Sequence, residues 1–342
     1  MGGRALKNTE TRRYQRGEFE ILSNELFSIL RQTFDRVEMP LFYKNKQSFG
    51  DADILVTMPA HNWHMRDYIQ DTFNPNEIFH NGNCWSFDYK ELQVDLITTS
   101  EEDFDTNLFY FSYNDLGNMV GRLAHGFGLK FGQEGLWLEY YFGGNHVGDI
   151  QVSKDFRKIY EFLGLSYDRY LEGFDELVDI FEFITTSPYF NWKKFQLSEL
   201  NKINRDRNKK RTSYVSFLEW VDNNVADSNH EYEYYDDKSL YFSDIINTFP
   251  DANILIEMRR MEFEYARNRY IKAKFNGGDV MRKYGFQGKE LGDILNGFKN
   301  FVEVYYVDFF DNFLLAYDVE DIYAKFDTYL SMKTVIDANG NN

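Results

Sequence analysis

The sequence contains very little cysteine and has no long apolar run. Cys84 is the one cysteine among 342 residues, so the chain cannot form an intrachain disulfide or a cluster of thiolate metal ligands. No stretch of about 18 apolar residues occurs, and Met1–Gly17 is polar and basic, without the apolar core of a signal peptide. We therefore expect a soluble protein of a reducing compartment, the cytoplasm, with no membrane partner.

Basic residues are also in the minority. The chain has 38 Lys and Arg against 55 Asp and Glu, a net charge of -17, which argues against non-specific coating of nucleic acid. The positive charge is concentrated in two tracts, Lys202–Arg211 and Arg259–Lys274. Each tract taken singly is typical of a solvent-exposed face, whereas the two together are compatible with a localised nucleic-acid groove.

Three aspartates lie in two short apolar segments, Ser48–Val56 and Gln93–Ile97. In a β-strand, residues two apart share a face, so Asp51 and Asp53 point the same way, and Asp95 joins them if the strands are neighbours. Carboxylates this close raise one another's pKa values unless a cation lies between them. Ligands that are all oxygen favour Mg²⁺ or Mn²⁺. The alternative is a polar turn that leads into an ordinary strand.

A wider pattern surrounds the first acidic segment. The run Asn45–Pro59 resembles the palm signature of DNA polymerase β and the other family X polymerases, which belong to a nucleotidyltransferase superfamily. The similarity continues through Val94–Ile97, Phe109–Ser112 and the pair Asn118 and Arg122, and it covers roughly residues 40 to 170. The resemblance implies a palm domain and transfer of a nucleotide to a nucleic-acid 3′-hydroxyl.

The resemblance also implies how the acids act. Asp51, Asp53 and Asp95 are expected to be the catalytic residues and the ligands of two Mg²⁺ or Mn²⁺ ions. One ion lowers the pKa of the attacking hydroxyl, and the other stabilises the leaving pyrophosphate. Asp95 is expected to accept the proton.

Further residues are assigned to the nucleotide by the same resemblance. Pro40-Leu41 stands where the superfamily has a Gly-Ser pair that grips the triphosphate, so other groups must bind the phosphates. Lys44 replaces a phosphate-binding Arg and keeps its charge without the bidentate fork. The predicted nucleotide-binding residues are Lys44, Lys46, Ser48, Gly50, Tyr110, Asn118 and Arg122. Asn118 and Arg122 lie four apart on one helix face, so a surface pair is the alternative for them.

Beyond Tyr170, apolar residues recur three and four apart, which predicts a separate helical domain. Within it, Phe275–Leu295 resembles a segment of the helical body of bacterial tRNA nucleotidyltransferases and poly(A) polymerases. Gly285 and Gly288 permit a tight turn that exposes backbone N–H groups at a helix start, which is either a phosphate site or a turn that merely packs. The predicted nucleic-acid-binding residues are Lys209, Lys210, Arg211, Gly288 and Lys289.

We therefore expect an α+β protein with a palm, a thumb-like subdomain and an all-α C-terminal domain. The predicted boundaries are a flexible basic tail at 1–17, the palm at 18–128, the thumb-like subdomain at 129–170, the helical domain at 171–330 and a tail at 331–342. The favoured reaction adds a nucleotide from an NTP to an RNA 3′ end, tRNA foremost. The alternatives are a DNA polymerase or terminal transferase that uses dNTPs, an enzyme that nucleotidylates a small molecule or protein, and an idle binding module.

Overall fold

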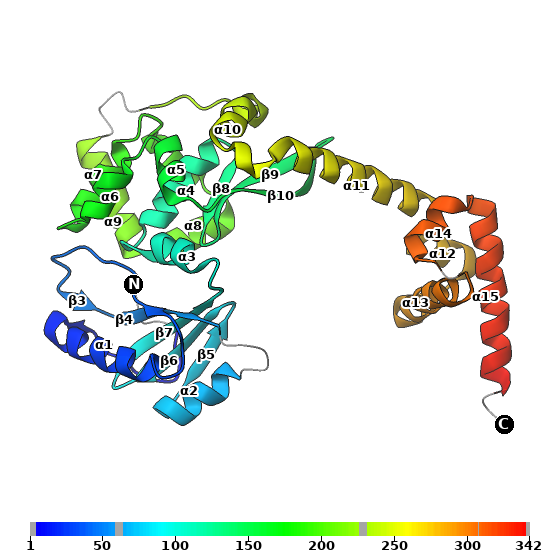
Figure 1. Ribbon diagram of the computed structural model, residues 1–342, viewed down its shortest axis with the longest axis horizontal. Coiled ribbons are helices and arrows are strands. Elements are labelled where there is room, and N and C mark those ends of the chain that lie inside the picture. The colour runs from blue at the N-terminus through cyan, green and yellow to red at the C-terminus, as the bar shows by residue number, and fades with distance from the viewer. Residues whose placement is uncertain (1–4, 59–63, 226–230, 307, 340–342) are drawn as a thin grey trace. The chain divides into compact units, whose positions relative to one another are not determined.

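The computed structural model describes residues 5–58, 64–225, 231–306 and 308–339 (Figure 1). The chain divides into two compact units, Met1–Tyr140 with Gly148–Leu255, and Tyr141–Val147 with Ile256–Asn342. The first unit is mixed α/β, and the second is mainly helical. The predicted helical domain is thus divided, because its helices up to Leu255 group with the strands. Residues 1–4 and 340–342 of the predicted tails lie outside the described residues.

A mixed five-stranded sheet forms one half of the first unit, in the order β2-β4-β7-β6-β5. Its strands are β2 (Val37–Glu38), β4 (Asp51–Thr57), β5 (Ile78–Asn81), β6 (Cys84–Tyr89) and β7 (Leu92–Thr99). The central pair, β4 and β7, is parallel, and the other neighbours are antiparallel. Asp95 lies in the antiparallel hairpin of β6 and β7. The two acidic strands are neighbours, as the convergence of the three aspartates requires, because β4 pairs with β7.

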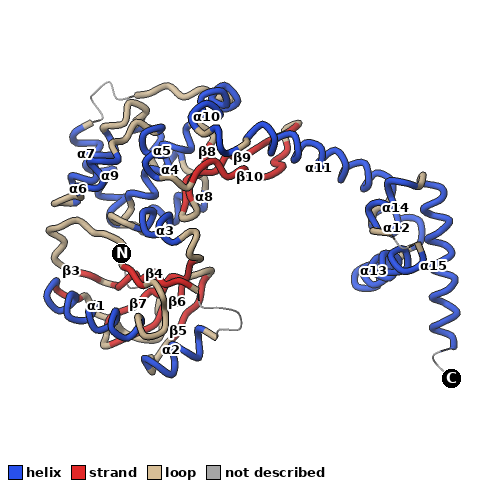
Figure 2. Tube along the Cα trace, viewed as in Figure 1, coloured by secondary structure: helices blue, strands red, loops and turns tan. Residues whose placement is uncertain are grey.

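The first unit also contains most of the helices (Figure 2). They are α1 (Arg16–Leu30), α2 (Met65–Phe73), α3 (Phe104–Phe111), α4 (Leu116–Gly126), α5 (Phe156–Phe162), α6 (Tyr167–Glu172), α7 (Leu177–Thr185), α8 (Lys202–Asn208), α9 (Thr212–Asn224) and α10 (Phe242–Thr248). Short 3₁₀ turns lie at Trp192–Phe195, Leu197–Glu199, Lys238–Tyr241 and Pro250–Ala252. A second sheet, in the order β10-β9-β8, consists of β8 (Leu129–Gly132), β9 (Gly135–Phe142) and β10 (Asn145–Ser153).

The two faces of β4 have different neighbours. Alternate residues of the strand are buried with α1 and α2 in one apolar core; they are Ala52, Ile54 and Val56. Leu55 is buried on the opposite face in a smaller core with Phe104 of α3. Asp51 and Asp53 have the same parity as Leu55, so they lie on the α3 face. Burial of the apolar residues, worth about 1.5–3 kcal/mol for each large side chain, fixes which way the aspartates point.

The segment before α1 differs from the flexible tail that was predicted for residues 1–17. β1 (Tyr14–Gln15) pairs antiparallel with β3 (Ser48–Phe49). The Ala5 N–H donates to Gln93 Oε1 at 2.9 Å, and the Tyr14 hydroxyl donates to the Lys90 carbonyl. These bonds compensate part of the chain entropy that a free tail would keep. The described part of the segment is therefore held by hydrogen bonds to β3, to β7 and to the turn before β7.

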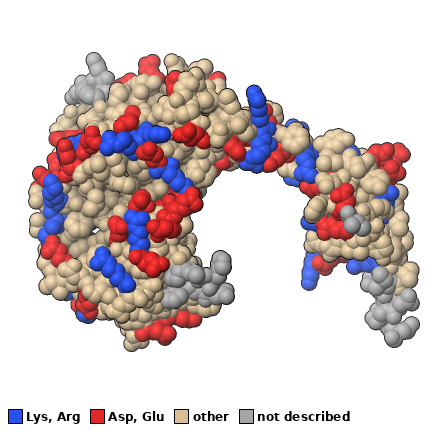
Figure 3. Space-filling view, in the orientation of Figure 1, with Lys and Arg blue, Asp and Glu red and all other residues tan. Residues whose placement is uncertain are grey.

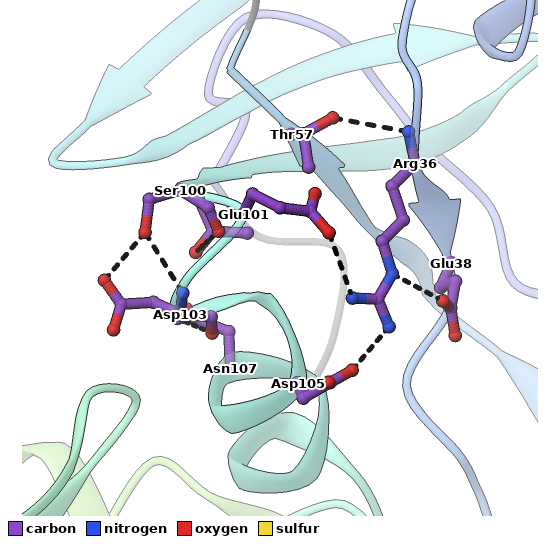
Figure 4. A network of polar contacts seen from close by, with 9 residues as sticks. Arg36, Glu38, Thr57, Ser100, Glu101, Asp103, Asp105 and Asn107 are labelled. Carbon is purple, nitrogen blue, oxygen red and sulfur yellow. Dashed lines mark hydrogen bonds and ion pairs between the residues drawn. The ribbon is translucent and has the colours of Figure 1, made fainter.

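Arg36 ties the carboxyl end of β4 to α3 (Figure 4). Its guanidinium lies 2.9 Å from Glu38 Oε1 and 3.7 Å from Glu101 Oε1, and it also pairs with Asp105. The same group lies over the ring of Phe104, 4.0 Å from its centroid. Three acids at this end of the strand therefore share one cation supplied by the protein.

The second unit has an aromatic core of its own. Its helices are α11 (Ile254–Lys274), of which the first two residues belong to the first unit, α12 (Gly277–Tyr284), α13 (Gly288–Tyr305), α14 (Phe310–Ala316) and α15 (Val319–Asn339). Phe298 is fully buried, with its ring 4.9 Å from that of Phe326 and 5.3 Å from that of Phe275. Residues 331–339, predicted as a tail, continue α15. None of the described helices combines the length and the apolar character needed to cross a membrane.

Candidate metal and nucleotide site

Asp51, Asp53 and Asp95 converge near the amino ends of β4 and β7. The parallel register places Asp53 opposite Asp95, and Asp51 opposite Gln93. One carboxylate oxygen from each aspartate lies within 4.8 Å of those of the other two. The structure thus brings together the three residues that the sequence predicted as metal ligands, and their donor set is one that a hard divalent cation prefers.

The surroundings of this cluster disfavour negative charge. Desolvation by the protein, followed by repulsion from Asp51 and Asp95, raises the pKa of Asp53 well above its ordinary value, and the cations Lys46 and Arg211 offset only part of this rise. Desolvation and the charge of Asp51 likewise raise the pKa of Asp95 to about 6. Asp53 nevertheless keeps solvent-exposed surface, and Asp51 and Asp95 repel its negative charge. A cation that entered from solvent would relieve it.

Gln93 holds Asp95 in place, and the sequence analysis did not single it out. Its Nε2 lies 2.8 and 2.9 Å from the two carboxylate oxygens of Asp95. Gln93 is buried, and its Oε1 accepts the N–H of Ala5. Donation from the amide lowers the pKa of Asp95 against the larger effect of burial. The spacing Gln-x-Asp in a strand was the available signal, because it puts both side chains on one face.

Lys46 is the lysine that the structure places beside the aspartates. Its Nζ lies over the ring of Phe49, 4.7 Å from the centroid. Desolvation lowers the pKa of Lys46, and the charges of Asp51 and Asp53 act in the opposite direction. The ammonium is therefore close enough to compensate part of the carboxylate charge, and it remains a candidate for the phosphates of a nucleotide.

The other three nucleotide-binding residues predicted in this segment have different surroundings. Lys44 Nζ lies 2.7 Å from Asp175 Oδ1, and both side chains are largely exposed. Ser48 Oγ accepts two hydrogen bonds from Arg13, from Nε at 3.2 Å and Nη2 at 3.1 Å. Gly50 is buried in the turn between β3 and β4. Nucleotide binding by these residues stays a prediction, and Lys44 would have to release Asp175 to take part.

Tyr110, Asn118 and Arg122 line one pocket of about 170 Å³ together with residues of β8 and α8. The side-chain amide of Asn118 donates to Asn208 Oδ1 at 3.2 Å, and Arg122 Nη2 donates to the Lys194 carbonyl at 2.7 Å. Arg122 Nε is buried and has no hydrogen-bond partner among the described residues. Sites for whole small molecules measure roughly 300–1,000 Å³, so the pocket as it stands suits a smaller group. Contact of these three residues with a nucleotide stays a prediction.

The cations that follow α8 divide into two kinds. Lys209 and Lys210 are exposed, and neither has an ion pair with a described residue. Arg211 instead pairs with Asp115, whose side chain is only 9% exposed. Asp115 immediately precedes α4, and its side chain makes no capping hydrogen bond to that helix. Arg211 therefore stabilises the fold at this point, and its charge also lowers the pKa of Asp53.

Gly288 and Lys289 lie in the second unit, at the start of α13. Gly285 ends α12 with a φ of 82°, and Gly288 has a φ of 53°, so both occupy the left-handed region that favours glycine. The tight turn is confirmed. Both glycines and Lys289 are exposed, and their binding of phosphate stays a prediction.

The face of the first unit drawn in Figure 3 shows no uniformly basic groove. On the face drawn in Figure 3, Lys and Arg lie interspersed with Asp and Glu over the first unit.

No family model matches the chain, and no curated protein matches it. The chemistry must therefore be inferred from the arrangement of the side chains.

Proposed function

We propose that the protein is a metal-dependent nucleotidyltransferase of the polymerase β superfamily that adds a nucleotide from an NTP to an RNA 3′ end. The observation that carries this proposal is the convergence of Asp51, Asp53 and Asp95 on two parallel strands in matching register. Repulsion between carboxylates raises the pKa values of Asp53 and Asp95 and lowers the stability of the fold, unless a bound ligand compensates their charge. The cytoplasm and a tRNA acceptor belong to the same proposal.

The residues fit the metal that this chemistry needs. Asp51, Asp53 and Asp95 would hold Mg²⁺ or Mn²⁺, and Asp51 and Asp53 would contribute to a second ion. Such ions, when bound, lower the pKa of a hydroxyl and stabilise charge on a leaving pyrophosphate. Their fit rests on three oxygen donors within 4.8 Å of one another, open to solvent at Asp53.

Each protein group then has a task of its own. Asp95 is suited to accept the proton of the attacking hydroxyl, because Gln93 fixes the orientation of its carboxylate. Lys46 supplies positive charge for the phosphates next to the carboxylates. Lys209 and Lys210 present free charge to an acceptor backbone, and positive charge of this kind positions a strand without reading its sequence.

One incubation series tests the proposal. The protein is mixed with Mg²⁺, each labelled NTP or dNTP in turn, and one of three acceptors: tRNA that lacks its 3′ end, single-stranded DNA, or primed DNA. We expect label from an NTP on the RNA, and none when a chelator replaces Mg²⁺. Template-directed use of dNTPs on primed DNA would favour a DNA polymerase instead. Label on none of the nucleic acids would contradict the proposal and favour a small-molecule or protein acceptor.

A further inference from the structure

The N-terminal segment delivers a cation to the turn that precedes the aspartates. In the β1–β3 pair, Tyr14 lies opposite Phe49 and Gln15 lies opposite Ser48. Tyr14 is buried, which fixes the register of this short ladder. Arg13, the residue before β1, consequently lies against Ser48: its Nη2 lies 2.8 Å from the Ser48 carbonyl oxygen. The position of its guanidinium is set by backbone pairing.

Arg12 and Arg13 are adjacent in sequence and differ in their partners. Arg12 forms ion pairs with Glu18 and Glu91, each at 3.0 Å. Arg13 donates only to the hydroxyl and the carbonyl of Ser48, and it has no acidic partner among the described residues. Its charge is therefore not neutralised by the protein, and the exposed guanidinium keeps donors free for a ligand.

Arg13 also lies near the other cation of this region. Desolvation is the main cause that lowers the pKa of Lys46, and the charge of Arg13 adds to it, whereas Asp51 and Asp53 oppose it. Arg16 holds the same turn, because its Nε donates to the Lys46 carbonyl at 3.1 Å. Two cations therefore lie at the turn that precedes Asp51 and Asp53: Lys46 belongs to the turn, and Arg13 contacts it through Ser48.

We propose that Arg13, held by Ser48 and working with Lys46, binds the polyphosphate of the nucleotide substrate. A guanidinium suits this task because it has five N–H donors, so that some can be held by the protein while others donate to phosphate oxygens. In Arg13, Nε and Nη2 donate to Ser48 and Nη1 remains available to a phosphate, whereas Lys44 is a single ammonium already paired with Asp175. The inference rests on the proposed function, since it concerns the substrate of the same site.

Binding without turnover tests this role. The full chain and the variants Arg13→Ala, Arg13→Lys and Arg12→Ala are titrated calorimetrically with ATP, with inorganic tripolyphosphate and with adenosine. Loss of charge-assisted hydrogen bonds should weaken ATP and tripolyphosphate about tenfold in Arg13→Ala. The affinity of Arg13→Lys should fall between those of the wild type and Arg13→Ala, because lysine keeps the charge but cannot donate to Ser48 and to a phosphate as the guanidinium does. Arg12→Ala should bind as the wild type does, and adenosine should bind equally to all four proteins.

Three results would overturn the inference: equal effects of Arg12→Ala and Arg13→Ala, an equal loss of adenosine binding, or no binding of either polyphosphate by the wild type. Thermal unfolding of each variant checks the fold. If Arg13→Ala does not fold, the affinity of Arg13→Lys for the polyphosphates provides the test. Failure of the proposed reaction gives a different pattern, since ATP binding would depend on Arg13 with no label transferred to any acceptor. Transfer that is unaffected by Arg13→Ala refutes the role of Arg13 alone.

Discussion

Two groups of three acids lie at opposite ends of β4, and their surroundings differ. The Arg36 cluster consists of Glu38, Glu101 and Asp105 around Arg36. The aspartate cluster consists of Asp51, Asp53 and Asp95. In the first, the acids are exposed and share a cation of the protein, whereas in the second they face one another and two of them have raised pKa values. The number of acids alone therefore does not indicate a ligand, whereas incomplete compensation of their charge by the protein does.

The largest effect should come from breaking the aspartate cluster. We expect Asp53→Ala to lower nucleotide transfer at least about a hundredfold, because even partners outside the ligand shell of a metal cost 10–100-fold. The free energy of unfolding should not fall, since the substitution removes repulsion. Labelled-nucleotide transfer and urea unfolding measure the two quantities. Glu38→Ala, in the Arg36 cluster, is the matched control and should keep its activity; transfer by Asp53→Ala within a few-fold of wild type would refute the assignment.

The reverse outcome is expected at the other end of the strand. Arg36→Ala should lower the free energy of unfolding by about 2 kcal/mol, because three acids lose their cation and Phe104 loses the guanidinium above its ring. Transfer per folded molecule should be unchanged. Urea unfolding, with activity assayed well below the midpoint, measures both. A loss of transfer without a loss of stability would mean that the Arg36 cluster also takes part in the reaction.

The aspartate cluster could be predicted from sequence because its signal is local. Strand parity puts Asp51 and Asp53 on one face, and the flanking apolar residues decide which face is buried. Asp95 required one more step, the pairing of β4 with β7, and the apolar run around it made that pairing a reasonable expectation.

Arg13 could not be assigned in the same way. The contact of Arg13 with Ser48 joins residues 35 apart through a strand of two residues, which has no periodicity to detect. The helices after Tyr170 show the opposite case: their periodicity predicts helices, but it does not say what they pack against. That is why residues up to Leu255 were assigned to a separate domain, although they group with the sheet.

A smaller effect is expected in how the free energy of unfolding depends on pH through Asp95 of the aspartate cluster. The pKa of Asp95 is raised to about 6, so protonation stabilises the metal-free fold at low pH, and this stability is lost as the pH rises through about 6. Asp95→Asn has no such charge and should therefore exceed the wild type by about 1 kcal/mol at about pH 8, and match it at about pH 4. Urea unfolding in chelator across this range measures the difference. A constant difference, or one unaffected by added Mg²⁺, would mean that repulsion at Asp95 is not what a cation relieves.

The smallest effect is expected at the exposed lysines of α13. They either bind a ligand or, like the acids around Arg36, bind none. Lys289 has no ion pair with a described residue, whereas Lys299 of the same helix lies 3.9 Å from Glu303. If Lys289 contacts an RNA phosphate, Lys289→Ala should reduce the slope of log affinity against log salt by about 0.7–0.9, because one counterion is no longer released. Lys299→Ala, the matched control, should leave the slope unchanged, and the KM for NTP should stay constant in both. Filter binding of tRNA that lacks its 3′ end, with single-stranded DNA of equal length beside it, measures the slopes. If the slopes are equal for both variants and the wild type, the lysines of α13 only form a solvent-exposed face. A folded RNA differs from DNA in its shape and its 2′-hydroxyls, so equal binding of RNA and DNA would contradict a folded RNA as the acceptor.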